Sequence, residues 1–561
     1  MEFLKLFKIS LRIIFINLIV ISFNEVNSYK CGTNKLQVNP GILNFTHKKS
    51  RRRLDNNDNE KENNNTTPIK IKVDYTSLNN TNENFEIIKN LINDTINKLQ
   101  EILEIEHEDI DLSNIENASF LIKGRCDIND IDENFGKFLI ENDVIIFPSF
   151  RNLSDLGENI LVSGEFCLIT KDYRVVGGKL YIQENIDFGI ENIDLNFKYA
   201  LFHEFTHILI FNPTLLNFLE MTGTEEEEKV NYKIVNSEKV LEKAREHFNC
   251  EKLQGIRLED LGGDGIAGFH WDPRYMLGDY MISLDYFDTV ISDITLALFE
   301  DSGFYKVNYY TGGLFKFGKK KGCVFFEKNC NYTSNKSLLF EDTFCFSPGE
   351  PLCSQSKINK GRCSIYDHNR NISIKYRYFD NPQYGGLERM DFCPISEEPN
   401  MMINNTFYFK YNCQFGNNDG LNLIEKFGNN SFCFIGTLVE SSNEKENNNS
   451  FCFEVECNND KNEIIVHIGS QTVTCKDNGG IINVDNVSGY KGTITCPKYI
   501  DICDFKNNTI CNEMFDCIKN HIETDNNSYI SNIIKSQSFS KFFENNAYSY
   551  ILIMSIFIFL N

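Results

Sequence analysis

The 561-residue sequence has few basic residues: 56 Lys and Arg stand against 79 Asp and Glu, so its formal net charge is −23. A protein that binds nucleic acid through the phosphates needs a basic face, and this balance argues against one. The hydrophobic fraction of 41% is ordinary, which excludes a multi-span membrane protein and a wholly disordered chain. The sequence contains no internal repeat of fixed period and no repeated CxxC pairs.

Cysteine is scarce in the first 300 residues, with only four of the 19, whereas fifteen lie between Cys323 and Cys517. A cytosolic chain seldom carries so many cysteines without metal-site spacing. We therefore expect an oxidising compartment in which the cysteines pair. The count is odd, so one thiol should remain without a partner.

Both ends of the chain predict the secretory pathway. Residues 1–28 combine basic residues, a short apolar run and a small residue, as in a secretory signal peptide; an uncleaved membrane anchor is the alternative. Residues 526–561 form a linker and an apolar tail, a pattern typical of a GPI-anchor signal, with a membrane span or a buried terminal helix as alternatives. Secretion would make Asn-x-Ser/Thr sites available for glycosylation. These sites include Asn44, Asn93, Asn152, Asn331, Asn371 and Asn486.

Between these ends the chain divides into segments of different texture. Residues 29–53 are interpreted as a pro-segment that ends in a tribasic processing site at Arg51–Arg53, with a solvated linker as the alternative. Ordered structure is expected from Ile69, and after Tyr310 cysteines become dense. We place a domain boundary between residues 300 and 345, and expect a mostly β, disulfide-linked region from Cys433 to Cys517.

Hydrophobic periodicity predicts a mixed core in the first half of the chain. Phe85–Leu103 has the spacing of an amphipathic helix, and residues 69–73 alternate like a half-buried strand. Further strands are expected at Val144–Phe147 and at Val175–Ile182, the latter opened by a turn at Gly177-Gly178. This order favours an α+β or α/β core.

One segment carries the pattern HExxH, in which His203, Glu204 and His207 are the defining residues. Residues 194–211 lack Gly and Pro, and so predict a helix that Asn212-Pro213 ends. Two histidines four residues apart share one helix face and can bind one metal ion, for which zinc is well suited. Glu204 beside them can accept a proton from water at the metal. The alternative is an apolar core helix with incidental histidines.

A catalytic zinc site needs a third protein ligand, and His270 is the best candidate. The glycine-rich residues 262–268 precede it, and Trp271, the only tryptophan, follows it. The glycines allow this loop to fold back towards the metal. Met281 lies eleven residues further on, and a methionine in a tight turn beneath three histidines is the feature that defines metzincins. The other histidines are His47, His107, His247, His368, His467 and His521.

Together these motifs resemble leishmanolysin, a family of surface zinc metalloproteases of the metzincin class. That family has a long insertion between HExxH and a third histidine followed by Trp, and here 62 residues separate His207 from His270. Residues 294–305 are similar to the family's helix after the methionine turn, and residues 474–503 to its C-terminal region. The resemblance covers roughly residues 67–517.

The resemblance implies an α+β fold with a metzincin-type zinc protease core and a disulfide-rich, mainly β C-terminal domain. The expected parts are an N-terminal mixed α/β catalytic subdomain at 54–212, a central subdomain at 213–325 and a Cys-rich, mainly β region at 326–525. The roles implied are zinc ligation by His203, His207 and His270, general base catalysis by Glu204 and a place under the metal for Met281.

Two departures from the family's pattern affect these expectations. The family has Gly three residues after the second histidine, where this chain has Ile210, so we expect the helix to continue to Asn212-Pro213. The family's pro-segment carries a cysteine that ligates the zinc before cleavage, and Cys31 would be that cysteine switch although the residues after it differ. The alternative is a cysteine without such a role. The eighteen others, Cys126 to Cys517, could then form nine bridges.

We therefore predict a zinc-dependent endopeptidase, secreted or at the cell surface, with one Zn²⁺ per chain and protein or peptide substrates. No nucleic acid partner is expected, and membrane contact would come from a C-terminal anchor. One alternative is an inactive adhesive surface glycoprotein that keeps a structural zinc, although such a site has no need of Glu204. Another is a metal-dependent hydrolase of non-peptide substrates.

Overall fold

The fold is described from a computed structural model of the chain. It describes residues 41–42 and 66–503, apart from 79–81, 107–124, 127–140, 155–159, 190–192, 228, 262–265, 285, 287–288, 310–314, 335–336, 398–411, 415–423, 429, 443–446, 459, 477–478 and 485–488. The predicted signal peptide, the processing site, Cys31 and the apolar tail lie outside the described residues. Among the described residues, no helix is both long enough and apolar enough to cross a membrane.

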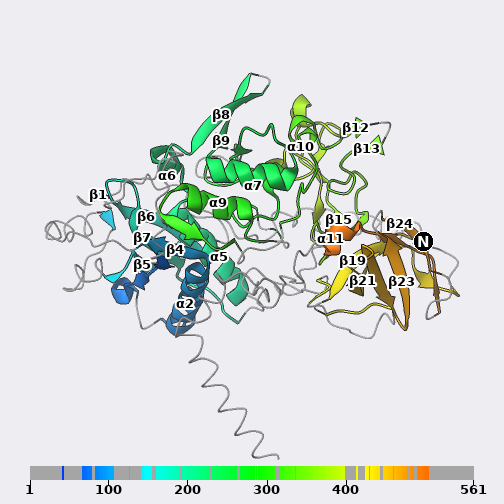
Figure 1. The fold of residues 1–561 in the computed structure, drawn as a ribbon, viewed down its shortest axis with the longest axis horizontal. Helices are drawn as coiled ribbons and strands as arrows, with labels where there is room; N and C mark the ends of the chain where they lie inside the picture. The colour runs from blue at the N-terminus through cyan, green and yellow to red at the C-terminus, as the bar shows by residue number, and fades with distance from the viewer. Residues whose placement is uncertain are drawn as a thin grey trace, which may run out of the picture.

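A five-stranded sheet in the order β1-β6-β7-β5-β3 is the scaffold of the N-terminal half (Figure 1). Its strands are β1 (Gly41–Ile42), β3 (Ile71–Val73), β5 (Val144–Arg151), β6 (Val162–Ile169) and β7 (Val175–Gln183). Strands β3, β5 and β7 are parallel, and β6 runs antiparallel to β7. Strand β1 pairs in parallel with the other side of β6.

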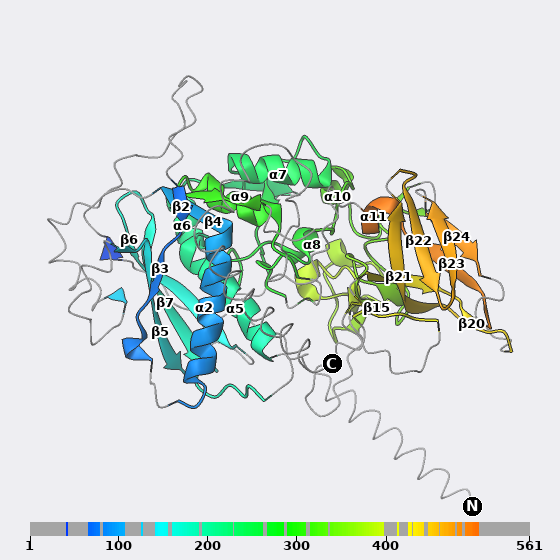
Figure 2. The same ribbon diagram turned by 60° about the horizontal axis from the view of Figure 1, so that its bottom comes forward.

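Helices α2 (Phe85–Ile102) and α5 (Ile193–Leu209) pack against each other beside this sheet, and α5 contacts β6 and β7 (Figure 2). Helix α2 confirms the periodicity of the sequence, because its apolar residues form one buried stripe. That stripe consists of Ile88, Leu91, Ile92, Ile96, Leu99 and Ile102. Helix α5 is buried almost all round from Phe197 onward, since it lies between the sheet and the central part of the chain.

The expected turn at Gly177-Gly178 is wrong: both glycines lie inside the continuous strand β7. Their role is close packing. A Cβ on Gly178 would lie 2.5 Å from Cγ2 of Ile208 on α5, and a Cβ on Gly177 would lie 2.9 Å from the Leu168 side chain on β6. The missing side chain at Gly178 therefore lets helix α5 approach the sheet closely.

The central part carries short helices and one small sheet, and a second small sheet joins it to the N-terminal part. Its helices are α6 (Pro213–Phe218), α7 (Glu238–Phe248), α8 (Pro273–Met276), α9 (Asp293–Asp301) and α10 (Val324–Glu327). The first sheet has the order β10-β9-β8 and consists of β8 (Thr222–Glu227), β9 (Val230–Val235) and β10 (Ile256–Arg257). The second sheet has the order β11-β4-β2 and consists of β2 (Thr66–Pro68), β4 (Leu103–Glu106) and β11 (Tyr305–Val307). Helices α7 and α9 pack on each other above the five-stranded sheet (Figure 1).

The C-terminal region is mostly β, as predicted. Its six-stranded antiparallel sheet has the order β23-β22-β21-β19-β26-β24. The strands are β19 (Ser431–Gly436), β21 (Asn449–Asn458), β22 (Glu463–Ile468), β23 (Gln471–Lys476), β24 (Gly480–Asn483) and β26 (Thr493–Cys496), followed by α11 (Tyr499–Cys503). Short pairs precede and flank it: β12 (Thr333–Ser334), β13 (Ser337–Leu338), β14 (Pro351–Cys353), β15 (Lys360–Cys363), β16 (Tyr366–Asp367), β17 (Tyr384–Gly385), β18 (Ser396–Glu397), β20 (Val439–Glu440) and β25 (Tyr490–Lys491).

Eight disulfides link the described cysteines. They are 126–167, 250–323, 330–393, 345–363, 353–433, 413–452, 457–503 and 475–496. Of the eighteen cysteines expected to pair, only Cys511 and Cys517 fall outside the described residues, so the ninth bridge stays a prediction.

Two large buried clusters contain most of the hydrophobic core of the described residues. The larger one extends from Ile69 to Ile395 and contains α5 and α9, and the smaller one extends from Ile424 to Cys503 under the six-stranded sheet. The mixed α+β fold with a mainly β, disulfide-rich C-terminal region is therefore confirmed. The domain boundaries expected from the sequence remain predictions.

Candidate metal centre

Helix α5 places the two HExxH histidines on one face, and each ring is oriented by a backbone carbonyl. Nδ1 of His203 lies 2.7 Å from the carbonyl oxygen of Tyr280, and Nδ1 of His207 lies 2.7 Å from that of Phe211. A carbonyl oxygen can only accept, so Nδ1 carries the hydrogen in both rings. Nε2 of each neutral imidazole then presents a lone pair, which is the form that binds a metal ion.

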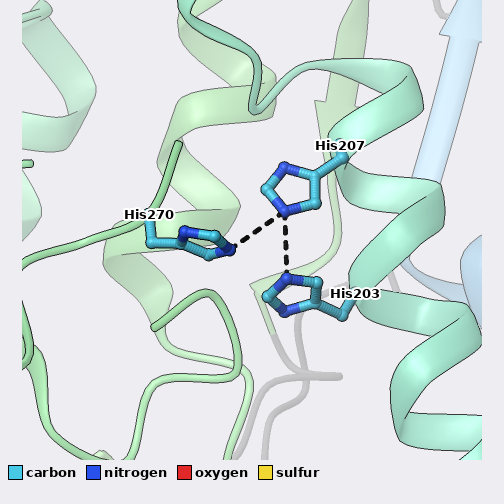
Figure 3. Close-up of side chains that lie close together, drawn as sticks. All are labelled: His203, His207 and His270. Carbon is cyan, nitrogen blue, oxygen red and sulfur yellow. Dashed lines mark hydrogen bonds between the residues drawn. The ribbon is translucent and has the colours of Figure 1, made fainter. Parts of the chain in front are cut away.

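His270 lies next to the two helix histidines, so the structure brings the three predicted ligands together. Nε2 of His207 lies 2.9 Å from Nε2 of His203 and 3.3 Å from Nε2 of His270, and Figure 3 shows the three rings converging. Nδ1 of His270 lies 3.2 Å from the carbonyl oxygen of Ile266, so its Nε2 also faces the others as an acceptor. Ligands of a tetrahedral zinc at about 2.0 Å are spaced by roughly 3.3 Å, close to these separations.

A cation bound between the three Nε2 atoms would explain why their lone pairs face one another. Three acceptor nitrogens pointing at one another repel unless a positive charge lies between them, and the three histidines offer one ligand nitrogen each within 4.8 Å of one another. Among the described residues, no other group of three metal-ligating side chains comes as close together. An all-imidazole donor set of this kind fits a zinc ion and leaves a coordination position for a reactant.

The electrostatics of the site keep the rings neutral. Burial lowers the pKa of His203 to about 4. Burial, and next the neighbouring imidazoles, hold the pKa values of His207 and His270 well below the ordinary value. Protons therefore do not compete for Nε2 near neutral pH, and the site is ready to ligate a metal.

The loop that carries His270 is closed at its base by backbone bonds. The Glu259 N–H donates to the His270 carbonyl across 2.9 Å, and the Gly268 N–H donates to the Glu259 carbonyl across 2.7 Å. Gly268 has φ of +83°, a conformation in which glycine is favoured. These bonds hold the described residues 266–270 against Glu259, whereas residues 262–265 of the glycine-rich segment lie outside the described residues.

The helix does not continue to Asn212-Pro213, and that expectation is wrong. Helix α5 ends at Leu209, and the N–H groups of Ile210 and Phe211 both donate to the Thr206 carbonyl, at 3.0 and 2.9 Å. The doubled bond to one carbonyl widens the last turn without a positive φ at Ile210, so no glycine is needed. The turn aims the Phe211 carbonyl back at His207.

Glu204 lies fully buried on the same helix, beside strand β6. The backbone N–H of Gly164 donates to its Oε2 across 2.7 Å, which fixes the direction of the carboxylate. A Cβ on Gly164 would lie 2.8 Å from the Glu204 carbonyl oxygen, so only glycine lets β6 approach the helix at this point. Strand β6 therefore orients the residue that the motif marks as a proton acceptor.

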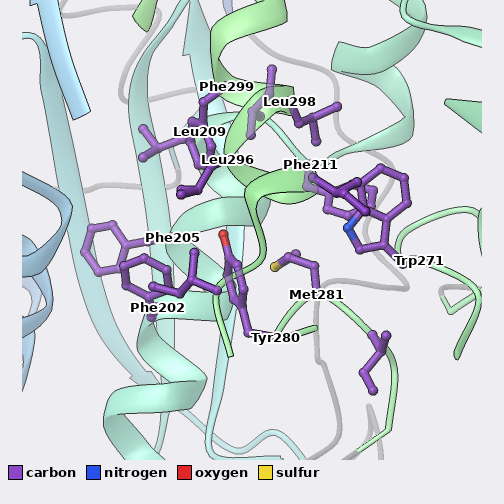
Figure 4. Close-up of a cluster of buried hydrophobic side chains, with 14 of the residues drawn as sticks. Phe202, Phe205, Leu209, Phe211, Trp271, Tyr280, Met281, Leu296, Leu298 and Phe299 are labelled. Carbon is purple, nitrogen blue, oxygen red and sulfur yellow. The ribbon is translucent and has the colours of Figure 1, made fainter. Parts of the chain in front are cut away.

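Met281 lies in a turn between Asp279 and Ile282, with its side chain fully buried. Figure 4 shows it close to Tyr280 and Trp271, within a cluster of aromatic and aliphatic side chains from α5 and α9. The Met281 carbonyl accepts a hydrogen bond from the Trp271 N–H across 3.0 Å. The turn thus contacts two ligand segments directly, one through Trp271 and one through the Tyr280 carbonyl.

Sequence reasoning missed the groups that orient the ligands. The groups that orient the histidines are the backbone carbonyls of Tyr280, Phe211 and Ile266, which no residue type reveals in a sequence. Two other residues offered a signal: Gly164 is a glycine inside a strand, and Asp279 lies two residues before Met281. The other described histidine on a helix near this region, His247, bonds the Phe317 carbonyl and lies outside the set of three.

A known protein family matches most of this chain. The family model described as leishmanolysin matches residues 85–509. The chain belongs to the leishmanolysin family. This membership implies the metzincin-type protease fold that the sequence resemblance suggested.

Individual relatives share about a quarter to a third of their aligned residues with this chain. A leishmanolysin-like peptidase of Drosophila pseudoobscura pseudoobscura is 28% identical over 299 residues, 47% of this chain and 43% of the relative. A leishmanolysin homolog of Crithidia fasciculata is 27% identical over 328 residues, 56% of this chain and 48% of the relative. A leishmanolysin-like peptidase of Caenorhabditis elegans is 30% identical over 220 residues, 35% of this chain and 33% of the relative. The aligned part spans less than half the length of each.

Proposed function

We propose that this leishmanolysin-family protein is a zinc-dependent endopeptidase that hydrolyses peptide bonds of protein or peptide substrates. The observation that supports it most strongly is the convergence of three neutral histidine Nε2 atoms beside a buried glutamate of the same helix. The relatives from Drosophila pseudoobscura pseudoobscura and Caenorhabditis elegans are named leishmanolysin-like peptidases, which supports the proposal.

In this proposal His203, His207 and His270 hold one Zn²⁺. Zinc bound in this way supplies Lewis acidity, which makes water nucleophilic near pH 7 and polarises a peptide carbonyl. The rings are held for this task by Nδ1–H bonds to carbonyls, so each ligand keeps its tautomer and direction. The turn that contains Met281 supports the ligands, because it bonds the Trp271 N–H next to His270 and, through the Tyr280 carbonyl, Nδ1 of His203.

Glu204 is the general base in the proposed reaction. Its carboxylate takes a proton from the attacking water and later donates it to the leaving amine. The Gly164 N–H donates to Oε2 of this carboxylate and so fixes its direction for the proton transfer. Burial of the helix around it keeps this exchange away from bulk solvent.

We also propose that the protein is made in the secretory pathway and acts outside the cell or at its surface. Eight disulfides among the described residues support an oxidising compartment. The N-terminal signal, the glycosylation sites and the C-terminal GPI signal belong to this proposal and rest on the sequence alone.

Residues 29–53 would keep the enzyme latent until cleavage at Arg51–Arg53, with Cys31 as a temporary zinc ligand. Strand β1 lies within this segment and pairs with β6 at Leu168 and Ile169. The same strand β6 orients Glu204 through Gly164. A pro-segment that adds a strand at this edge would contact the catalytic half directly.

Hydrolysis of a denatured protein by Glu204→Gln tests the proposal. Because the amide cannot accept the proton, we expect the rate to fall by at least about a thousandfold while the zinc content stays at one per chain. Glu242→Gln, the same change on the exposed face of α7, should retain full activity. Unchanged hydrolysis by Glu204→Gln would overturn the role of Glu204 and favour another catalytic group.

A further inference from the structure

A closed ring of four hydrogen bonds lies behind the metal ligands. The indole Nε1–H of Trp271 donates to Oγ1 of Thr295 across 2.7 Å, and the Thr295 hydroxyl donates to Oδ2 of Asp279 across 2.8 Å. Oδ1 of Asp279 accepts from the Met281 N–H across 2.7 Å. The Met281 carbonyl accepts from the Trp271 N–H across 3.0 Å, which returns the ring to its start.

All four members of this ring, Trp271, Thr295, Asp279 and Met281, are completely shielded from solvent. Burial makes each bond important, because a buried polar group that loses its partner is destabilising. Thr295 occupies the first turn of α9, where its own N–H is capped by the Ser292 hydroxyl at 3.1 Å. The ring is therefore anchored to a helix end that is itself fixed.

The ring connects segments that lead directly to two ligands. Trp271 follows His270 directly in the chain, so the position of Trp271 determines the position of the His270 backbone. Met281 follows Tyr280, whose carbonyl bonds Nδ1 of His203. A shift of the ring would therefore displace His270 from His203 and His207 without any change in a ligand.

We propose that Asp279 is a positioning residue of the metal centre, which acts through Thr295 and Trp271 to fix His270 against helix α5. The inference rests on the proposed zinc site, and adds a residue that touches neither metal nor substrate. A carboxylate suits the position because it accepts on both oxygens, from the Met281 N–H and from Thr295. The single hydrogen of the Thr295 hydroxyl then points to Asp279, and its lone pair is free to receive Trp271.

The test compares Thr295→Val, Thr295→Ser and Thr95→Val in the full chain. Valine at 295 removes the hydroxyl but keeps the volume, and serine restores the hydroxyl. Thr95 is the matched control, because it is equally buried and its Oγ1 donates to the Leu91 carbonyl of its own helix α2. The measurements are the zinc dissociation constant by chelator competition, the melting temperature and the fluorescence of Trp271, the only tryptophan.

We expect Thr295→Val to weaken zinc binding by about 10–100-fold, as loss of groups behind a metal ligand typically does. Its Trp271 emission should shift, because the indole N–H loses its acceptor. Thr295→Ser should restore both the affinity and the emission of the unmodified protein. Thr95→Val should lower the melting temperature without changing either quantity.

Asp279→Asn provides the second variant. The amide presents N–H groups where Thr295 needs an acceptor, so the zinc dissociation constant should rise although the shape is kept. The inference is overturned if Thr295→Val and Asp279→Asn melt at lower temperature, as Thr95→Val does, but bind zinc as tightly as the unmodified protein. If the unmodified protein itself binds no zinc, the proposed metal centre fails and this inference fails with it.

Discussion

The carbonyl oxygen of Tyr280 lies 2.7 Å from Nδ1 of His203 and joins the HExxH helix to the methionine turn. The other two ligand rings are likewise oriented by backbone carbonyls, those of Phe211 and Ile266. The geometry of the site therefore depends on where three loops lie. Changes that move those loops should alter zinc binding or catalysis even where no ligand is replaced.

Gly164→Ala should damage catalysis more than stability. The added Cβ would lie 2.8 Å from the Glu204 carbonyl oxygen and 3.1 Å from Glu204 Cβ, so helix and strand must separate. A displacement of the base by less than 1 Å can reduce the rate by about 10–100-fold. The turnover number of the variant, measured well below its melting temperature, checks this expectation.

Gly177→Ala is the control for that substitution, because the atoms nearest to its added Cβ belong to the Leu168 side chain, the closest at 2.9 Å. It should lower the melting temperature and leave the turnover number close to that of the unmodified protein. Equal loss of turnover in both variants would show that the sheet, and not the contact with Glu204, is responsible.

Glu259→Gln should make the stability of the protein less dependent on pH. Burial raises the pKa of Glu259 to about 7, so between about pH 4.5 and 7 the folded protein keeps a proton that the unfolded chain releases. The stability that this proton gives is present below about pH 4.5 and is lost as the pH rises through 7. The unmodified protein should lose up to about 3 kcal/mol of unfolding free energy from this group.

Glutamine resembles the protonated carboxyl group in shape and as a hydrogen-bond donor, but it does not titrate. The unfolding free energy of Glu259→Gln should therefore fall less between pH 5 and 8 than that of the unmodified protein. Denaturant titrations at the two pH values measure this difference. Glu226→Gln, on the exposed side of β8, should keep the slope of the unmodified protein. An identical slope in Glu259→Gln would mean that this carboxyl does not titrate in that range.

Removal of the 250–323 disulfide should weaken both stability and zinc binding. The bridge closes 73 residues that contain His270 and Met281, and a loop of that length corresponds to about 4 kcal/mol in the chain-entropy account. Cys250→Ser/Cys323→Ser should therefore unfold at lower denaturant and release zinc more readily. Cys475→Ser/Cys496→Ser, in the six-stranded sheet, should leave zinc affinity unchanged. Zinc binding that weakens in this variant but not in Cys250→Ser/Cys323→Ser would contradict a role of the 250–323 bridge in holding the metal site.

Cys31→Ser should raise the basal activity of the unprocessed form. A thiolate is a strong zinc ligand and would block the position that water needs, whereas a serine hydroxyl binds zinc far more weakly. Ser50→Ala, in the same predicted pro-segment, should leave the unprocessed form inactive. Equal activity of Cys31→Ser and the unmodified proform would remove Cys31 from the mechanism.

The elements whose signal is local could be predicted from the sequence. Helix α2 follows from its apolar spacing, and α5 from HExxH within a run free of Gly and Pro. His270 could be predicted because few histidines are available, and it alone follows a glycine-rich segment and precedes Trp. For the two helices the deciding information lies within the segment itself, and for His270 it lies in the residues on either side and in the small number of histidines.

What could not be predicted depends on contacts between distant segments. Gly178 looked like a turn, but its missing side chain matters only because Ile208 packs on it. The end of α5 at Leu209 depends on two hydrogen bonds to the Thr206 carbonyl, which cannot be recognised from the types of these residues. The hydrogen bonds that Asp279 accepts from Thr295 and Met281 likewise form only once α9 is packed.

The dependence of the enzyme on zinc is tested by the zinc content and peptide hydrolysis of the purified, processed protein before chelation, after chelation and after zinc is returned. We expect one zinc per chain, loss of hydrolysis when the metal is removed and recovery of hydrolysis when it is returned. Hydrolysis that persists at the full rate in the metal-free protein would contradict this dependence.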